Sequence, residues 1–128
     1  MRPETLLLRQ VNPSFIQNGR VTSQIFRPTP KDLELLSVEN GDLIAPEASF
    51  SRFTKASNCR SFGVLGVSAR ECSACNLQII EDGDPYPEHC SIDFRAMSKS
   101  QTEKHAKTLR ANAEIRGWLF VGPESRDR

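Results

Sequence analysis

The chain has 128 residues, of which 38% are hydrophobic and 26% charged, and its 17 basic and 16 acidic residues leave a net charge of +1. This length fits one domain, and the composition is that of a globular chain rather than a disordered one. The near-zero charge argues against a dedicated nucleic-acid binder, and no apolar run approaches the roughly 20 residues of a membrane span. The N-terminal segment turns polar after three leucines and does not resemble a signal peptide, so we expect a cytoplasmic protein.

Apolar runs and turn residues predict the first half of the chain. Strands are expected over residues 5–11, 20–26 and 35–38, the first two forming a hairpin across a long loop, with a helical turn at residues 29–32. Asn40-Gly41 predicts a tight turn, after which residues 42–44 pair back. Pro46, Glu47 and Lys55 favour a helix over residues 46–56.

The second half carries clearer helix signals. Residues 61–67 are expected to form a central strand, and Ser68 with Glu71 has the spacing of a capping box that begins a helix over residues 69–75. Strands are expected at residues 77–80 and 90–94, on either side of an acidic loop. Capping boxes beginning at Ser98 and Ser100 predict one long helix over residues 99–116, which Gly117 follows. Residues 118–121 are too apolar to be left in solvent and are expected to dock as a short strand or core plug.

This order of elements predicts an α+β domain rather than a doubly wound fold. We expect a small antiparallel or mixed sheet covered by the long C-terminal helix, in one domain over residues 1–121 with a frayed tail over 122–128. The expected core consists of Phe62, Val64, Leu65, Val67, Ile79, Ile92, Phe94, Leu109 and Trp118.

The four cysteines are Cys59, Cys72, Cys75 and Cys90. Cys72 and Cys75 have the CxxC spacing of zinc ribbons, but structural zinc sites usually draw their ligands from two such pairs, and only one is present. Without a secretory signal a disulfide framework is not expected either. We therefore predict ordinary thiols, no metal and no cofactor.

The loop Glu81–His89 is the segment that concentrates chemistry. Asp, Gly and Pro also favour turns, so a solvated acidic turn explains much of it. As a functional surface it would bind through five side chains, those of Asp82, Asp84, Tyr86, Glu88 and His89.

Two catalytic alternatives remain open. His89 could face Cys72 across the sheet and form a Cys–His pair. Arg9, Ser23, Ser37 and Glu81 are residue types with which ADP-ribosyltransferase-like folds bind NAD. No phosphate-binding loop, dinucleotide fingerprint, zinc-protease motif or serine-hydrolase motif is present.

Several short motifs carry a resemblance over about residues 8–120. They include Phe26–Asp32, Leu36–Val38, Pro87–His89, Ile92–Phe94 and Ser98–Gln101. With them the chain resembles a group of short bacterial proteins to which no activity is attached, and the resemblance implies only a bacterial cytosolic protein.

Three classes of function follow. The first is a subunit that acts by binding another protein, of an accessory, immunity, antitoxin-like or defence-associated kind. The sequence does not fix its oligomeric state. The second is a small enzyme built on the Cys–His pair or the NAD set; a zinc-stapled binding module is a third reading. A deep pocket containing His89 favours the enzyme, and a flat surface with an exposed apolar patch favours protein binding.

Overall fold

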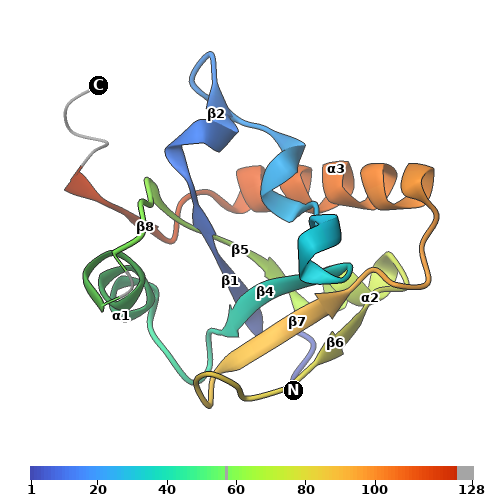
Figure 1. The fold of residues 1–128 in the computed structure, drawn as a ribbon, viewed down its shortest axis with the longest axis horizontal. Coiled ribbons are helices and arrows are strands. Elements are labelled where there is room, and N and C mark those ends of the chain that lie inside the picture. The colour runs from blue at the N-terminus through green and yellow to red at the C-terminus, as the bar shows by residue number, and fades with distance from the viewer. Residues whose placement is uncertain (57, 124–128) are drawn as a thin grey trace.

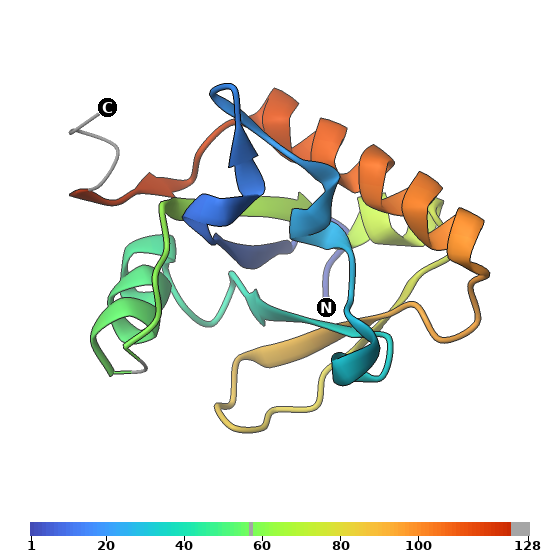
Figure 2. The ribbon, with the colours of Figure 1, turned by 45° about the horizontal axis from the view of Figure 1, so that its top comes forward.

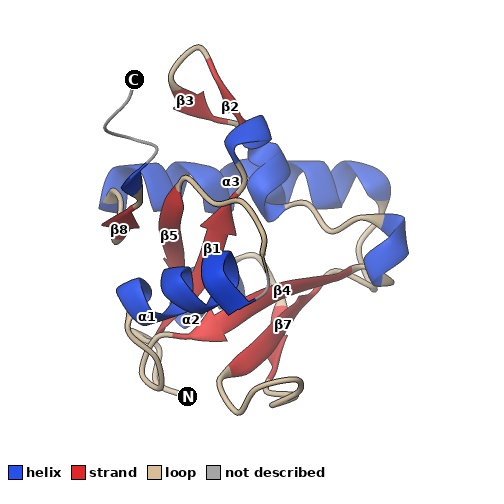
Figure 3. Cartoon of the chain, turned by 60° about the vertical axis from the view of Figure 1, so that its left-hand side comes forward, coloured by secondary structure: helices blue, strands red, loops and turns tan. Residues whose placement is uncertain are grey.

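The computed structural model describes residues 1–56 and 58–123, and its central feature is one six-stranded sheet. The strand order is β6-β7-β4-β1-β5-β8, and every neighbouring pair is antiparallel (Figure 1). These strands are β1 (Leu6–Val11), β4 (Leu35–Asn40), β5 (Gly63–Ser68), β6 (Gln78–Ile80), β7 (His89–Asp93) and β8 (Phe120–Val121). A separate hairpin of β2 (Ile16–Gln17) and β3 (Arg20–Val21) projects from the sheet (Figure 3).

Helices cover both faces of the sheet, so each face has its own apolar core. On one face α3 (Lys99–Arg116), α2 (Ala69–Ala74) and the 3-10 helix Ser23–Phe26 enclose the larger cluster. On the other, α1 (Pro46–Ser51) and its π-helical continuation Arg52–Ala56 place Phe50 against Leu8 and Val64. Figure 2 shows α1 and α3 on opposite sides of the strands. Two further 3-10 helices, Pro13–Phe15 and Pro30–Asp32, lie in the connections.

Local capping explains where α2 and α3 begin. Ser68 Oγ accepts from the Glu71 N–H at 3.1 Å, and the Glu71 carboxylate accepts from the Ser68 N–H at 2.7 Å. Ser98 and Gln101 form the same reciprocal pair at the start of α3. Both capping boxes satisfy N–H groups that the first helical turn leaves without partners, as the sequence predicted.

The two middle strands separate partway along their length. β1 pairs with β5 over all six of its residues, but with β4 only at Leu7 opposite Asn40 and Leu8 opposite Glu39. Beyond Leu8 the strands diverge (Figure 1). Arg9 occupies this opening: its Nε donates to the Ile25 carbonyl at 2.8 Å and its Nη1 to the Ser37 carbonyl at 3.0 Å. The side chain thus gives the Ser37 carbonyl a donor where β1 has moved away.

The α+β fold with an antiparallel sheet and a long C-terminal helix is confirmed. The strand predicted over residues 20–26 is wrong beyond Val21, because Ile25 and Phe26 are consecutive and both fully buried, which a strand exposed on one face does not allow. The predicted hairpin between the first two strands is also wrong, since β1 pairs with β4 and β5. Residues 42–44 do not pair back; the Leu43 and Ile44 N–H groups donate to the Asn40 carbonyl and lead into α1.

Most of the predicted core is confirmed, with one clear exception. Six of its residues are buried: Val64, Leu65, Val67, Ile92, Phe94 and Leu109. Phe62 and Ile79 are half-buried. Trp118 is 38% exposed, so its core placement is wrong: it follows α3 near the sheet edge and packs against Phe62, with 5.2 Å between the ring centroids.

The chain end also departs from the expected frayed tail at its first residue. The Gly122 N–H donates to the Phe62 carbonyl at 2.9 Å, which continues the β5–β8 contact. Residues 124–128 of that tail lie outside the described residues.

Candidate functional site

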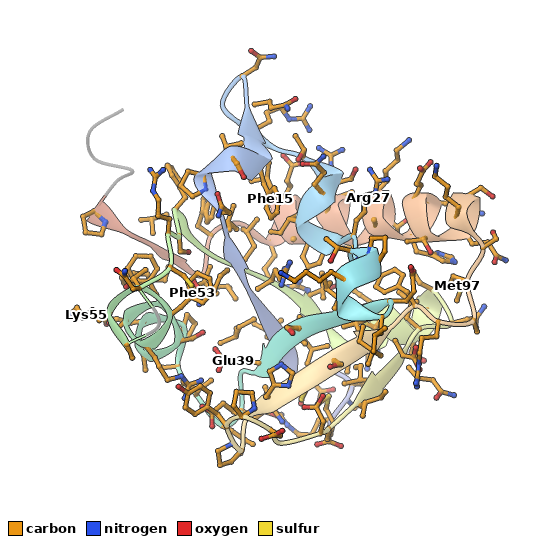
Figure 4. All side chains as sticks on the ribbon, viewed as in Figure 1. Phe15, Arg27, Glu39, Phe53, Lys55 and Met97 are labelled. Carbon is orange, nitrogen blue, oxygen red and sulfur yellow. The ribbon has the colours of Figure 1, made fainter. Side chains whose placement is uncertain are left out.

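A pocket of about 480 Å³ opens on the α1 face, where β1 and β4 diverge. Its apolar walls come from segments far apart in the sequence, namely Leu8, Phe15, Val38, Phe53, Pro85 and Tyr86. Its polar lining consists of Arg9, Gln10, Asn12, Ser37, Glu39, Ser49, Arg52 and His89. Figure 4 labels three of these residues, Phe15, Phe53 and Glu39. Aromatic walls with a few polar groups are typical of small-molecule sites.

Arg52 joins the α1 segment to the β6–β7 loop beside the pocket. Its guanidinium donates to the carboxylates of Glu39 on β4 and Glu88 in the loop, and it lies 3.7 Å from the ring centroid of Tyr86. The hydrogen bond from Arg52 lowers the pKa of Glu88, because it stabilises the ionised carboxylate. This cluster fixes the loop against the π-helical turn and so sets one wall of the pocket.

A line of hydrogen bonds runs from Glu39 back under α1. Ser49 Oγ donates to Glu39 Oε1 at 2.5 Å and accepts from Gln10 Nε2 at 2.9 Å. Gln10 Oε1 in turn accepts from Ser61 Oγ at 2.8 Å. Since Ser49 and Ser61 are buried, these bonds also satisfy polar groups that would be costly to leave unpaired. Both oxygens of Glu39 are therefore engaged, one by Ser49 and the other by Arg52.

His89 forms a pair with Asp82 at the same pocket. Glu39 lies opposite His89 across β4 and β7, so the two side chains share a face of the sheet. His89 Nδ1 is 2.5 Å from Asp82 Oδ1, and Ser91 Oγ donates to Asp82 Oδ2 at 2.8 Å. Burial raises the pKa of Asp82, but the hydrogen bonds from His89 and Ser91 outweigh it and the pKa is lowered. Asp82 is thus a carboxylate that orients the His89 ring.

The predicted loop residues take different places. Tyr86 and His89 line the pocket, Asp82 orients His89, and Glu88 binds Arg52. Asp84 is exposed and does not line the pocket. The loop therefore contributes to the candidate site as part of a wall, not as a free acidic surface.

The predicted pairing of His89 with Cys72 is not formed. Cys72 is fully buried with Cys75 and Cys90 in the core on the α3 face, whereas His89 lies on the α1 face. Alternation along β7 separates them: Cys90 points into that core, so its neighbour His89 points away from it. Burial also raises the pKa of Cys72 to about 12, which makes it a poor nucleophile.

The predicted NAD set is brought together only in part. Arg9 and Ser37 line the pocket, whereas Ser23 and Glu81 do not, and the acid in the lining is Glu39. Within residues 1–56 and 58–123, no three His, Cys, Asp or Glu side chains are arranged to hold a metal ion.

Sequence reasoning missed Glu39 and Arg52, which form the charged part of the site. One available signal was Glu39, an acid in a strand whose other residues are uncharged. Another was the Phe50/Phe53 pair, of which only Phe50 is needed for the core: Phe53 lines the pocket.

The chain matches no family model, no curated protein and no solved structure. In the part of the chain that the structure describes, no helix is both long and apolar enough to cross a bilayer. The pocket is thus the feature from which a function can be argued.

Proposed function

We propose that this protein binds a small, largely planar organic molecule in the pocket between β1, β4 and the Arg52–Ala56 turn. One observation carries the proposal: aromatic walls and charged groups from distant segments surround a single cavity of about 480 Å³. Pockets of roughly 300–1,000 Å³ with this mixture are the usual size for small ligands.

The walls favour a flat ligand. Phe15, Phe53 and Tyr86 present rings from three separate segments, and Leu8 adds an aliphatic surface. Aromatic rings pack well against planar groups in offset or edge-to-face arrangements. A ligand bound here would gain mainly from burial of its own apolar surface.

The polar groups of the lining are held in place before any ligand binds. Two backbone carbonyls hold the Arg9 guanidinium, Ser49 and Arg52 hold Glu39, and Asp82 holds His89. Binding would therefore cost little side-chain entropy, which favours affinity and fixes the orientation of the ligand.

A fluorescent dye tests the proposal without knowledge of the natural ligand. The probe is 8-anilino-1-naphthalenesulfonate, an aromatic anion that fluoresces in apolar sites. Ser37 is an exposed β4 residue that lines the pocket, so Ser37→Trp should fill the cavity. Gln78→Trp on β6 is the matched control, because it places the same ring on an exposed strand position outside the lining.

We expect saturable binding of about one dye per chain to the wild type and to Gln78→Trp, and at least tenfold weaker binding to Ser37→Trp. Circular dichroism confirms that both variants are folded. Equal affinity of the two variants for the dye would place the binding elsewhere and refute the proposal.

Protein binding by an accessory, immunity or antitoxin-like subunit of the bacterial cytoplasm is the second candidate. The observation that favours it is the apolar strip at the sheet edge, where Trp118 is 38% and Val121 43% exposed. Edge strands with exposed apolar side chains are common docking sites. On this proposal Trp118→Ala loses a partner that the wild-type chain captures, yet still binds the dye; capture that survives Trp118→Ala would contradict it.

A further inference from the structure

The Asp82–His89 pair has the geometry of a proton-transfer site. His89 and Ser91 are two residues apart on β7 and share a face, so one carboxylate reaches both. Asp82 accepts from His89 at one oxygen and from Ser91 at the other, over 2.5 and 2.8 Å. Held at both oxygens, the carboxylate cannot turn away from the imidazole ring.

The contact with Asp82 determines that Nδ1 of the His89 ring carries a proton. An ionised carboxylate has no hydrogen to donate, so Nδ1 carries the proton and donates it to Asp82. In the neutral ring with the proton on Nδ1, Nε2 keeps its lone pair. Nε2 makes no hydrogen bond with any described residue, and His89 lines the pocket. In that form, a histidine with an unprotonated ring nitrogen lines the pocket.

Glu39, the other base in the lining, is less suited to this role. Its two oxygens already accept hydrogen bonds from Ser49 and Arg52. Accepting a proton from a ligand would weaken both contacts and leave the Arg52 cation with one carboxylate fewer. His89 has no such conflict, because the imidazolium formed on protonation lies against the Asp82 carboxylate.

We propose that the pocket is catalytic, with His89 as the base that removes a proton from a bound carbon acid, a small aromatic or conjugated carbonyl compound. This inference rests on the proposed function. The C–H bond next to the carbonyl breaks, its electron pair stays on the substrate as an enolate, and the proton moves to Nε2. The imidazolium exchanges that proton with solvent and then returns a solvent-derived proton to the carbon of the enolate, so no oxidant or reductant is needed.

Two other residues support this step. Asp82 is a positioning residue, which sets the tautomer and offsets the charge of the imidazolium. Arg9 lines the same pocket, and its positive charge favours the enolate over the neutral ketone.

The first experiment reads the tautomer directly. Long-range proton–nitrogen NMR spectra distinguish Nδ1–H from Nε2–H in each neutral histidine ring, and the chain has only two histidines, His89 and His105. We expect the Nδ1–H form for His89 in the wild type and a shift toward Nε2–H in Asp82→Ala, with His105 unchanged. An Nε2–H tautomer for His89 in the wild type would overturn the inference.

The second experiment measures the chemistry, as exchange of the methyl protons of 4-nitroacetophenone with D2O, followed by proton NMR. We expect the wild type and the matched control His105→Gln to accelerate exchange equally. His89→Gln should fall to the buffer rate, and Asp82→Ala should lose at least tenfold. Displacement of the dye by the ketone checks that all four proteins bind it.

The outcomes separate the two proposals. Dye binding that survives Ser37→Trp defeats the proposed function. Normal binding of dye and ketone, with wild-type exchange no faster than buffer or unaffected by His89→Gln, defeats only the catalytic inference. If the ketone does not displace the dye, the exchange assay lacks a bound substrate. The tautomer of His89 is then the measurement that supports or overturns the catalytic inference.

Discussion

Replacing Arg52 with Met should destabilise the fold by about 2–3 kcal/mol at pH 7. Met keeps most of the apolar stem but removes two charge-assisted hydrogen bonds, each contributing about 1.5–3 kcal/mol when well buried. Here the side chains of Arg52, Glu39 and Glu88 are 24%, 17% and 11% exposed. Water can therefore solvate the two carboxylates in the variant, which reduces the loss of stability. For 128 residues an unfolding entropy near 2.1 cal/mol/K per residue converts this to a Tm lower by about 7–11 °C.

A double-mutant cycle with Glu88→Gln isolates the contact. Urea unfolding of both single variants and the double variant should give a coupling of about 1 kcal/mol or more. Because Arg52 lowers the pKa of Glu88 in the folded state, its contribution is present at neutral pH and is lost as the pH falls through that pKa. The difference between the wild type and Arg52→Met should therefore shrink below about pH 4. A loss under about 0.5 kcal/mol at pH 7, or zero coupling, would refute this account of the cluster.

Three further outcomes follow from burial. Leu109→Ala should cost about 2–5 kcal/mol in urea unfolding, because Leu109 is fully buried where α3 packs on the sheet, and a cost below about 1 kcal/mol would contradict that packing. Trp118→Ala should cost only about 1–2 kcal/mol, since much of the ring is solvated, and a loss above about 3 kcal/mol would mean that the ring is buried in solution. Iodoacetamide at pH 8 should label the native protein at exposed Cys59 and spare Cys72, whose thiol is buried with its pKa raised to about 12; mass spectrometry showing equal labelling of both would contradict the structure.

The elements that the sequence predicted best are those with local signals. The capping residues Ser68 and Ser98 mark the starts of α2 and α3, and the predicted bounds of α3 agree with the structure. The strand prediction for residues 20–26 was wrong because the conformation of this segment depends on its packing against α3, up to almost a hundred residues away. That packing buries Ile25 and Phe26 together. The order of the strands in the sheet could not be predicted for the same reason, because pairing between distant segments leaves no local pattern in the sequence.

The residues of the candidate site also divide into those with a local sequence signal and those without one. Loop residues 81–89 stood out by composition, and three of them, Pro85, Tyr86 and His89, do line the pocket. Glu39 and Arg52 did not stand out, because an ion pair between a strand and a helical turn has no fixed spacing in the sequence. The predicted Cys72–His89 pair was wrong because it required both side chains on one face of the sheet. Alternation along β7 places His89 on the face opposite to Cys72.

The opening beside Arg9 divides the sheet mechanically into two three-stranded plates, β6-β7-β4 and β1-β5-β8. Their shared ladder consists of two residue pairs, and past it the plates are bridged by the side chain of Arg9. The seam between the plates thus has two residue pairs where β1 and β5 share six, and a molecule seated in the pocket would lie directly against it, in contact with residues of both β1 and β4.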